Sequence, residues 1–415
     1  MGYIINVSWK VALVWICVYT YIPMPPGISN PYRLTLLVAS SRVGRHVASL
    51  ASYLGIREEH EVLRALVDFA SSRKNDNDGI VSRDTEISEV PIRVYQPIAR
   101  VGDTLPTIIY FHGGGFMLGG LDSYDETVRS IMTSFDIKII SVGYRLAPEY
   151  TYPAAYRDCL AVTKRVLQNA DDYYVDIDNV AVMGDSAGGN LAAAVAQKLH
   201  LASVNGEEEI PALKFQALIY PALQSLTFDL PSHLQNDRIL PTFNDRNTTI
   251  NFRLTYAFGV IDPEIHDAIL RGQLLEKVKQ SDKAFLANFV DDSNVPDKYK
   301  QRENRVNASV SEKITIPQKV FRVFTNPSFS PLMRKDLRGL SDTYMVTAEF
   351  DVLRDEGILY AKRLENAGVD VTLDHIESGF HGMINFGHYD AGKECREKVR
   401  EYIQKKFNLI TVPVL

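Results

Sequence analysis

One stretch of eleven residues, 180–190, constrains the fold of this 415-residue chain more than any other. The apolar residues 180–183 predict a buried strand, and the alanine-rich run 191–199 predicts a helix. Between them stands Gly-Asp-Ser-Ala-Gly, which leaves the chain a single sharp turn in which to reverse. A strand that turns so tightly into a helix holds its central side chain strained and exposed. We therefore predict that Ser186 is a nucleophile.

The neighbours of Ser186 supply what such a turn needs. Gly184 and Gly188 allow close backbone packing, and Asp185 completes the supporting motif. The N–H of Ala187 is expected to be unpaired at the helix N-terminus, beside the positive end of the helix dipole. By chance, the pentapeptide alone would occur in roughly one chain of this length in ten, so the strand–turn–helix context carries the prediction.

A second motif, His-Gly-Gly-Gly, directly follows a predicted strand at 107–111. Its members are His112, Gly113, Gly114 and Gly115. Acyl transfer builds negative charge on a carbonyl oxygen, which needs preset hydrogen-bond donors. Gly113 and Gly114, together with Ala187, are the donors we expect to form this oxyanion hole. His112 is expected to orient the loop, and Gly115 belongs to the supporting motif.

A serine nucleophile needs a base and an acid that orients the base. His381 follows the last predicted strand in a loop with glycine at 379 and 382, where a ring can project. Asp351 follows the strand predicted at 343–347 and precedes a helical run. The order Ser186, Asp351, His381 is that of the α/β-hydrolase arrangement.

Other acids and histidines compete for these two roles. His375 falls within the last strand pattern and fits a core position, while His388 lies farther along the chain. Asp374 also falls within that strand. Asp355 and Glu356 lie in the following helix, where we expect solvated or helix-capping charges.

Strands and helices alternate along most of the chain. The predicted strands are residues 92–95, 107–111, 139–142, 180–183, 217–220, 343–347 and 369–373. The predicted helices are residues 34–70, 154–167, 191–199, 354–367 and 393–407. This alternation predicts an α/β fold with a mostly parallel central sheet flanked by helices. Residues 71–84 are polar and predict a loop, and residues 228–335 predict a helical insertion over one end of the sheet.

Composition excludes several classes of function. A net charge of −6 without a basic run argues against a nucleic-acid partner. Zinc-site and nucleotide-phosphate motifs are absent from the sequence, so we expect neither a metal nor a cofactor. Cys17, Cys159 and Cys395 cannot form a disulfide framework, and Cys159 with Cys395 is either one disulfide or two free thiols.

The N-terminus contains a twelve-residue apolar block at 11–22, preceded by Lys10 and ended by Pro-Met-Pro-Pro. A signal-anchor, a cleaved signal peptide and a core helix all fit. No small-residue cleavage site follows closely, which favours the anchor. Asn247 and Asn307 begin glycosylation sequons, whose use would place the body in the secretory lumen or outside the cell.

These motifs together resemble the arylacetamide deacetylase and neutral cholesterol ester hydrolase family of hormone-sensitive-lipase-like α/β-hydrolases. The resemblance covers nearly the whole chain and is thinnest at about 230–335. The residues that carry it are 21–25, 112–116, 144–148, 184–191, 218–224, 351–357 and 379–382. One departure is Phe116, where relatives often have tryptophan.

The resemblance implies an α/β-hydrolase fold with a helical cap, and a serine carboxylester hydrolase whose triad is Ser186, Asp351 and His381. We expect a signal-anchor at 1–26 and a hydrolase domain at 27–415, with cap portions at about 30–90 and 228–335. The family places its catalytic body in the lumen of the endoplasmic reticulum, as a single-pass type II membrane protein.

Three hypotheses for the function stay open at this stage, two of which differ only in the substrate. The first is a lipid ester of the neutral cholesterol ester or acetylated ether-lipid type, which suits a membrane-anchored chain. The second is a small aryl amide or ester, and the third is a hydrolase-fold protein that binds a ligand without turnover. The sequence leaves the oligomeric state undetermined.

Overall fold

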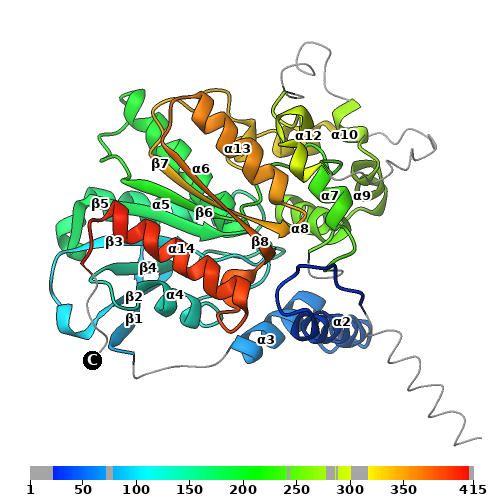
Figure 1. Ribbon diagram of the computed structural model, residues 1–415, viewed down its shortest axis with the longest axis horizontal. Coiled ribbons are helices and arrows are strands. Elements are labelled where there is room, and N and C mark those ends of the chain that lie inside the picture. Colours follow the sequence, from blue (N-terminus) through cyan, green and yellow to red (C-terminus); the bar gives the residue numbers. More distant parts are fainter. Residues whose placement is uncertain are drawn as a thin grey trace, which may run out of the picture.

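The structure, a computed structural model, describes residues 22–71, 78–240, 244–276, 286, 288–300 and 316–410. At its centre lies an eight-stranded sheet with the order β1-β2-β4-β3-β5-β6-β7-β8 (Figure 1). The strands are β1 (Ile80–Ile87), β2 (Val90–Pro97), β3 (Leu105–Phe111), β4 (Lys138–Val142), β5 (Val175–Asp185), β6 (Phe215–Ile219), β7 (Asp342–Phe350) and β8 (Val371–Phe380). Strands β3 to β8 run parallel, and β1 and β2 pair antiparallel at one edge. The predicted α/β fold with a mostly parallel sheet is confirmed.

Helices cover both faces of this sheet, so its central strands are apolar throughout. The covering helices are α4 (Asp125–Met132), α5 (Ala154–Gln168), α6 (Ala187–Val204), α13 (Arg354–Asn366) and α14 (Asp390–Lys406). Alternate residues of β3 enter two separate cores. Ile109 packs in the core that contains α5, α6 and α13, whereas Ile108 packs in the core that contains α4 and α14. This burial is why the central strands were predictable from apolar runs alone.

Strand β1 corrects the predicted loop at 71–84. Residues 80–87 pair with β2 along their whole length, although only Ile80 and Ile87 are buried. An edge strand has one partner and a solvated face, so its sequence is polar like that of a loop. Ser82 on this strand accepts a hydrogen bond from Arg129 of α4 at 2.9 Å, which fixes the edge against the helix layer.

Two helices precede the sheet in place of the single helical stretch predicted at 34–70. They are α2 (Pro31–Tyr53) and α3 (Glu59–Ser71). Gly55, with φ of +66°, allows the chain to turn between them. The two helices contact each other and lie beside the sheet in Figure 1.

In the described part of the segment between β6 and β7 the α-helices gather at one end of the molecule, joined by short turns and loops (Figure 1). Its helices are α7 (Pro231–Asn236), α8 (Arg246–Phe258), α9 (Pro263–Leu270), α10 (Gln273–Glu276) and α12 (Gln318–Phe324). The exact limits of the two cap portions stay a prediction. Asn247 is exposed in the first turn of α8, whereas Asn307 lies outside the described residues.

Most of the predicted signal-anchor, residues 1–21, also lies outside the described residues. Within the part that the structure describes, no helix combines the length and apolar character needed to cross a membrane. Cys17 belongs to the segment not described. Cys159 and Cys395 are both buried free thiols, which answers the pairing question left open by their spacing.

Candidate active site

Ser186 lies in a tight turn between the end of β5 and the start of α6. Its backbone adopts φ of 53° and ψ of −116°, a conformation that L-residues rarely take. A Cβ on Gly188 would lie 1.9 Å from the carbonyl oxygen of Phe111, and one on Gly184 would lie 2.4 Å from Gly188. Strand β3 therefore passes too close for any larger residue at either position, as predicted for a strained strand-to-helix turn.

Three side chains predicted from the sequence form one hydrogen-bonded chain. The Nε2 atom of His381 lies 2.9 Å from Oγ of Ser186, and its Nδ1 lies 2.8 Å from Oδ2 of Asp351. Ser186, Asp351 and His381 follow β5, β7 and β8, whose carboxyl ends meet at the same edge of the parallel sheet. The Asp351 side chain is fully buried and that of His381 is 12% exposed, so little water competes for these hydrogen bonds.

Further residues hold the acid and the ring in place. Asp351 Oδ1 accepts 2.8 Å hydrogen bonds from Nδ2 of Asn244 and from the N–H of Leu353. The ring of Tyr220 lies 4.9 Å from the ring of His381. Sequence reasoning missed Asn244, because this residue comes from the insertion, where no local motif marks it.

The glycine-rich loop after β3 lies against the same turn. The N–H of Gly113 donates to Oδ1 of Asp185 at 2.9 Å, so it does not remain free for a substrate oxygen. Gly114 and Gly115 have φ of +111° and +63°, which allow the loop to bend away from the strand. No acceptor in the described part of the chain takes the N–H of Gly114, Gly115 or Ala187. Gly113, which the sequence predicted as an oxyanion donor, therefore already has an acceptor in Asp185.

Comparisons with known proteins agree with this geometry. A family model described as "alpha/beta hydrolase fold" matches residues 108–272 and 297–385. The chain is 34% identical to arylacetamide deacetylase of Oryctolagus cuniculus, with 93% of this chain and 96% of that protein aligned. It is 35% identical to neutral cholesterol ester hydrolase 1 of Mus musculus, over 89% and 90% of the two chains.

The chain belongs to the α/β-hydrolase family, in its arylacetamide deacetylase and neutral cholesterol ester hydrolase group. Solved esterases also match this hydrolase. The metagenomic thermostable carboxylesterase EstE1 superposes with a TM-score of 0.60 at 26% identity, covering 84% of this chain and 97% of that one. The Pyrobaculum calidifontis esterase gives 0.59 at 27% identity, over 83% and 92%. These relationships make the chain a carboxylic ester hydrolase.

Asp185 connects the two motifs of this hydrolase from a fully buried position. Besides Gly113, it accepts hydrogen bonds from the hydroxyls of Tyr110 at 2.9 Å and Tyr124 at 3.0 Å. Burial raises the pKa of the Asp185 carboxyl, and the three donors oppose that rise by stabilising the ionised form. Asp185 therefore acts as a buried acceptor that fixes the loop relative to the turn.

His112 is a buried, neutral residue at the start of the loop, and its predicted orienting role stays a prediction. Burial lowers its pKa to about 4. Its Nδ1 lies 2.8 Å from the carbonyl oxygen of Gly113, so that nitrogen carries the proton and donates. The ring stacks on Tyr144 at 4.3 Å, and the Tyr144 hydroxyl donates to the His112 carbonyl at 2.6 Å.

The rival histidine and acid of β8 have other partners. His375 lies 3.0 Å from Oγ1 of Thr347 and 3.1 Å from Oε2 of Glu349. Asp374 accepts a hydrogen bond from the hydroxyl of Tyr344 at 2.8 Å. Both residues thus take part in polar packing within the sheet, apart from the Ser186 chain.

Asp355 and Glu356 correct the expectation of solvated or helix-capping charges, since both are fully buried. Asp355 accepts the N–H of Ser232 at 2.7 Å and pairs with Arg354 at 2.9 Å. Glu356 accepts the N–H of Leu223 at 2.6 Å. These carboxylates hold the chain that leaves β6 against α13, and a pattern of charges in a helix does not reveal that a loop will cover them.

Helix α8 of the insertion covers the glycine-rich loop with aromatic side chains. A Cβ on Gly115 would lie 2.6 Å from the ring of Phe252, so that ring rests directly on the loop. The rings of Tyr256 and Phe116 stack at 3.9 Å with an interplanar angle of 5°. Phe116 therefore joins the loop to the insertion.

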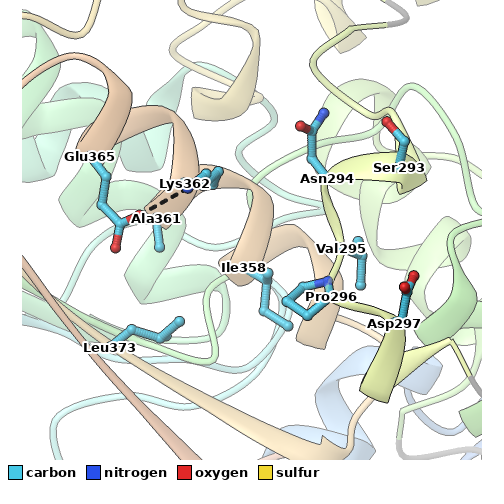
Figure 2. Close-up of a pocket in the computed structure, with 10 residues that line it drawn as sticks. All are labelled: Ser293, Asn294, Val295, Pro296, Asp297, Ile358, Ala361, Lys362, Glu365 and Leu373. Carbon is cyan, nitrogen blue, oxygen red and sulfur yellow. Dashed lines mark ion pairs between the residues drawn. The ribbon is translucent and has the colours of Figure 1, made fainter.

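A separate cavity of about 420 Å³ lies between α13, Leu373 of β8 and the turn at 293–297 (Figure 2). Ile358 and Val295 supply apolar lining, and Lys362 pairs with Glu365 at its edge. It contains none of the residues of the Ser186 chain. Among the described residues, no cluster of three or more histidine, cysteine or acidic side chains could hold a metal ion.

Proposed function

We propose that Ser186, His381 and Asp351 form the catalytic triad of this hydrolase. The observation that carries the proposal is the pair of hydrogen bonds of 2.9 and 2.8 Å that joins the three side chains. His381 takes the proton of Ser186 as the hydroxyl attacks the ester carbonyl, and Asp351 holds the ring and stabilises the imidazolium. The same ring then returns the proton to the leaving alcohol.

The negative charge that forms on the carbonyl oxygen needs donors beside Ser186. We assign this role to the N–H groups of Gly114, Gly115 and Ala187, since Gly113 donates to Asp185. Ala187 is the first residue of α6, where the helix dipole adds positive potential. Water then attacks the acyl-enzyme with His381 again as base, which releases the acid and restores Ser186.

A lipid ester of the neutral cholesterol ester or acetylated ether-lipid type is the substrate that we propose. The relative named neutral cholesterol ester hydrolase 1 supports this class of substrate, and the partly buried Phe252 ring, which rests on Gly115, supplies an apolar side chain beside the proposed oxyanion donors. An anchor at 1–26, a catalytic body in the lumen of the endoplasmic reticulum and glycans on Asn247 and Asn307 complete the proposal. They rest on the sequence pattern and the family resemblance.

A small aryl amide or ester is the alternative substrate. The chain is 34% identical to arylacetamide deacetylase and 35% identical to neutral cholesterol ester hydrolase 1, so sequence identity does not separate the two substrate classes. The test compares kcat/KM of the purified full chain on a cholesteryl ester, an acetylated ether lipid and an aryl acetamide. Ser186→Ala is the control that measures background hydrolysis, which is then subtracted from the rate of the wild type. A lipid preference of at least tenfold supports the proposal, and a preference for the aryl acetamide refutes it.

A further inference from the structure

Helix α2 has two opposite apolar faces, of which only one is covered. Leu34, Val38 and Ala48 are buried against the body of the protein. On the other side, six apolar side chains at least half exposed form what we call the outer stripe: Tyr32, Leu36, Val43, Val47, Leu50 and Leu54. At 100° per residue these six positions fall within an arc of about 60°. A stripe of this length is unusual on a protein surface exposed only to water.

The polar groups near the outer stripe are compatible with an apolar partner. Ser40 lies at its margin, and its hydroxyl donates to the carbonyl of Leu36 at 2.8 Å, so its donor is already satisfied. By the same count Arg33 and Arg42 lie on either side of the stripe, Arg45 lies on the covered side, and α2 contains no aspartate or glutamate in a chain whose net charge is −6. A basic helix with an apolar stripe matches an anionic lipid surface.

Helix α3 packs beside α2 and adds exposed apolar side chains of its own. Leu66 of α3 is 39% exposed and approaches Gly44 of α2, where an added Cβ would lie 3.2 Å from its side chain. Phe69 of the same helix is 84% exposed. A phenylalanine ring exposed to that extent loses much contact with water if a lipid surface covers it.

With the N-terminal apolar block as the proposed membrane anchor, on which this inference rests, the position of α2 in the chain favours a lipid bilayer over a second protein. The apolar block of the sequence ends at Ile22, and α2 begins at Pro31, so the connection spans at most about 30 Å. We propose that the outer stripe of α2 lies on a lipid bilayer, parallel to its surface, as a contact additional to the N-terminal segment. This contact does not depend on the chemistry proposed for Ser186.

The proposed contact is tied to the candidate active site through Arg64 of α3. Its guanidinium donates to the carbonyls of Met117 and Ala147, each at 2.7 Å, and pairs with Glu149 at 2.6 Å. Met117 directly follows the glycine-rich loop and Phe116. A bilayer against α2 is therefore linked through one side chain to the loop on which the proposed oxyanion donors lie.

A fluorescent probe on the full chain tests the contact. Cys17→Ser removes the one cysteine outside the described residues, and Cys159 and Cys395 are too buried to react. An environment-sensitive dye is attached to Val47→Cys in the stripe or, as matched control, to Ser49→Cys, which is exposed on another side of α2. In vesicles of phosphatidylcholine and phosphatidylserine with a spin-labelled acyl chain, we expect at least threefold more quenching at position 47.

Equal quenching at the two positions would overturn the proposal, because the N-terminal segment alone then holds the protein. In a second sample, pyrene is attached to Val47→Cys. Excimer emission from this sample without quenching by the lipid label would also overturn the proposal, since a second copy of the chain would then cover the stripe. Leu36→Glu with Leu50→Glu should abolish most of the quenching at position 47. Both side chains are exposed, so the fold should tolerate the change.

Discussion

The backbone N–H of Gly113 donates to Oδ1 of Asp185 at 2.9 Å, which joins two motifs that lie 72 residues apart. The glycine-rich loop is thereby fixed to the residue that precedes Ser186. This bond leaves the Gly113 N–H unavailable to a substrate, and it gives Asp185 a structural role beside the residues to which we assign the chemistry.

Removal of this acceptor should disorganise the proposed oxyanion hole. Asp185→Ala leaves Gly113, Tyr110 and Tyr124 without their partner, and we expect a loss of unfolding free energy of about 3 kcal/mol. We expect kcat/KM for a soluble ester to fall about 100-fold, as when one oxyanion donor is lost. Asp185→Asn keeps an oxygen that accepts from Gly113, so it should retain more activity than Asp185→Ala. Equal activity in both variants would contradict this role.

The buried His112 should make stability depend on pH. Burial lowers its pKa to about 4 in the folded chain from 6.5, so the unfolded chain binds a proton first as pH falls. Stability should therefore fall between pH 6.5 and pH 4, by up to about 3 kcal/mol, and this contribution should level off below pH 4. Urea unfolding of the wild type and of His112→Gln at pH 7, 6 and 5 measures the difference in slope. A variant with the same slope as the wild type would refute the assignment.

The contact between Gly115 and Phe252 should appear as energetic coupling. Gly115→Ala adds a Cβ that would lie 2.6 Å from the Phe252 ring, at a backbone φ of +63°. We expect kcat/KM to fall at least tenfold, since the loop must shift or α8 must move away. Phe252→Ala removes the clash, so the double variant should recover part of the loss. If the fold-decrease in kcat/KM of the double variant equals the product of the two single fold-decreases, the two residues are not coupled and the ring does not rest on the loop.

The sequence predicts those parts of this hydrolase in which burial or close packing restricts the residue types within a short stretch of the chain. The apolar runs of β3, β5 and β6 and the small residues Gly184 and Gly188 follow from such local constraints. Residues 80–84 of edge strand β1 are wrongly predicted as part of a loop, because only Ile80 and Ile87 of this strand are buried. Asp355 and Glu356 were misjudged because the segment that buries them comes from more than 100 residues away.

The candidate site shows the same limit. The residue types of Ser186, Asp351 and His381 and their positions at strand ends were apparent from the sequence, and the structure places the three side chains within hydrogen-bonding distance. The choice of donors in the glycine-rich loop was not apparent, since it depends on where Asp185 points. Asn244 escaped notice because only the folded insertion brings it to the acid.

Covalent labelling tests the central claim most directly. The full chain is treated with a fluorophosphonate, digested, and the modified peptide identified by mass spectrometry. We predict one adduct, on Ser186, which disappears in Ser186→Ala and forms at least 100-fold more slowly in His381→Ala. An adduct on another residue, or labelling of Ser186→Ala at the wild-type rate, would contradict the proposed triad.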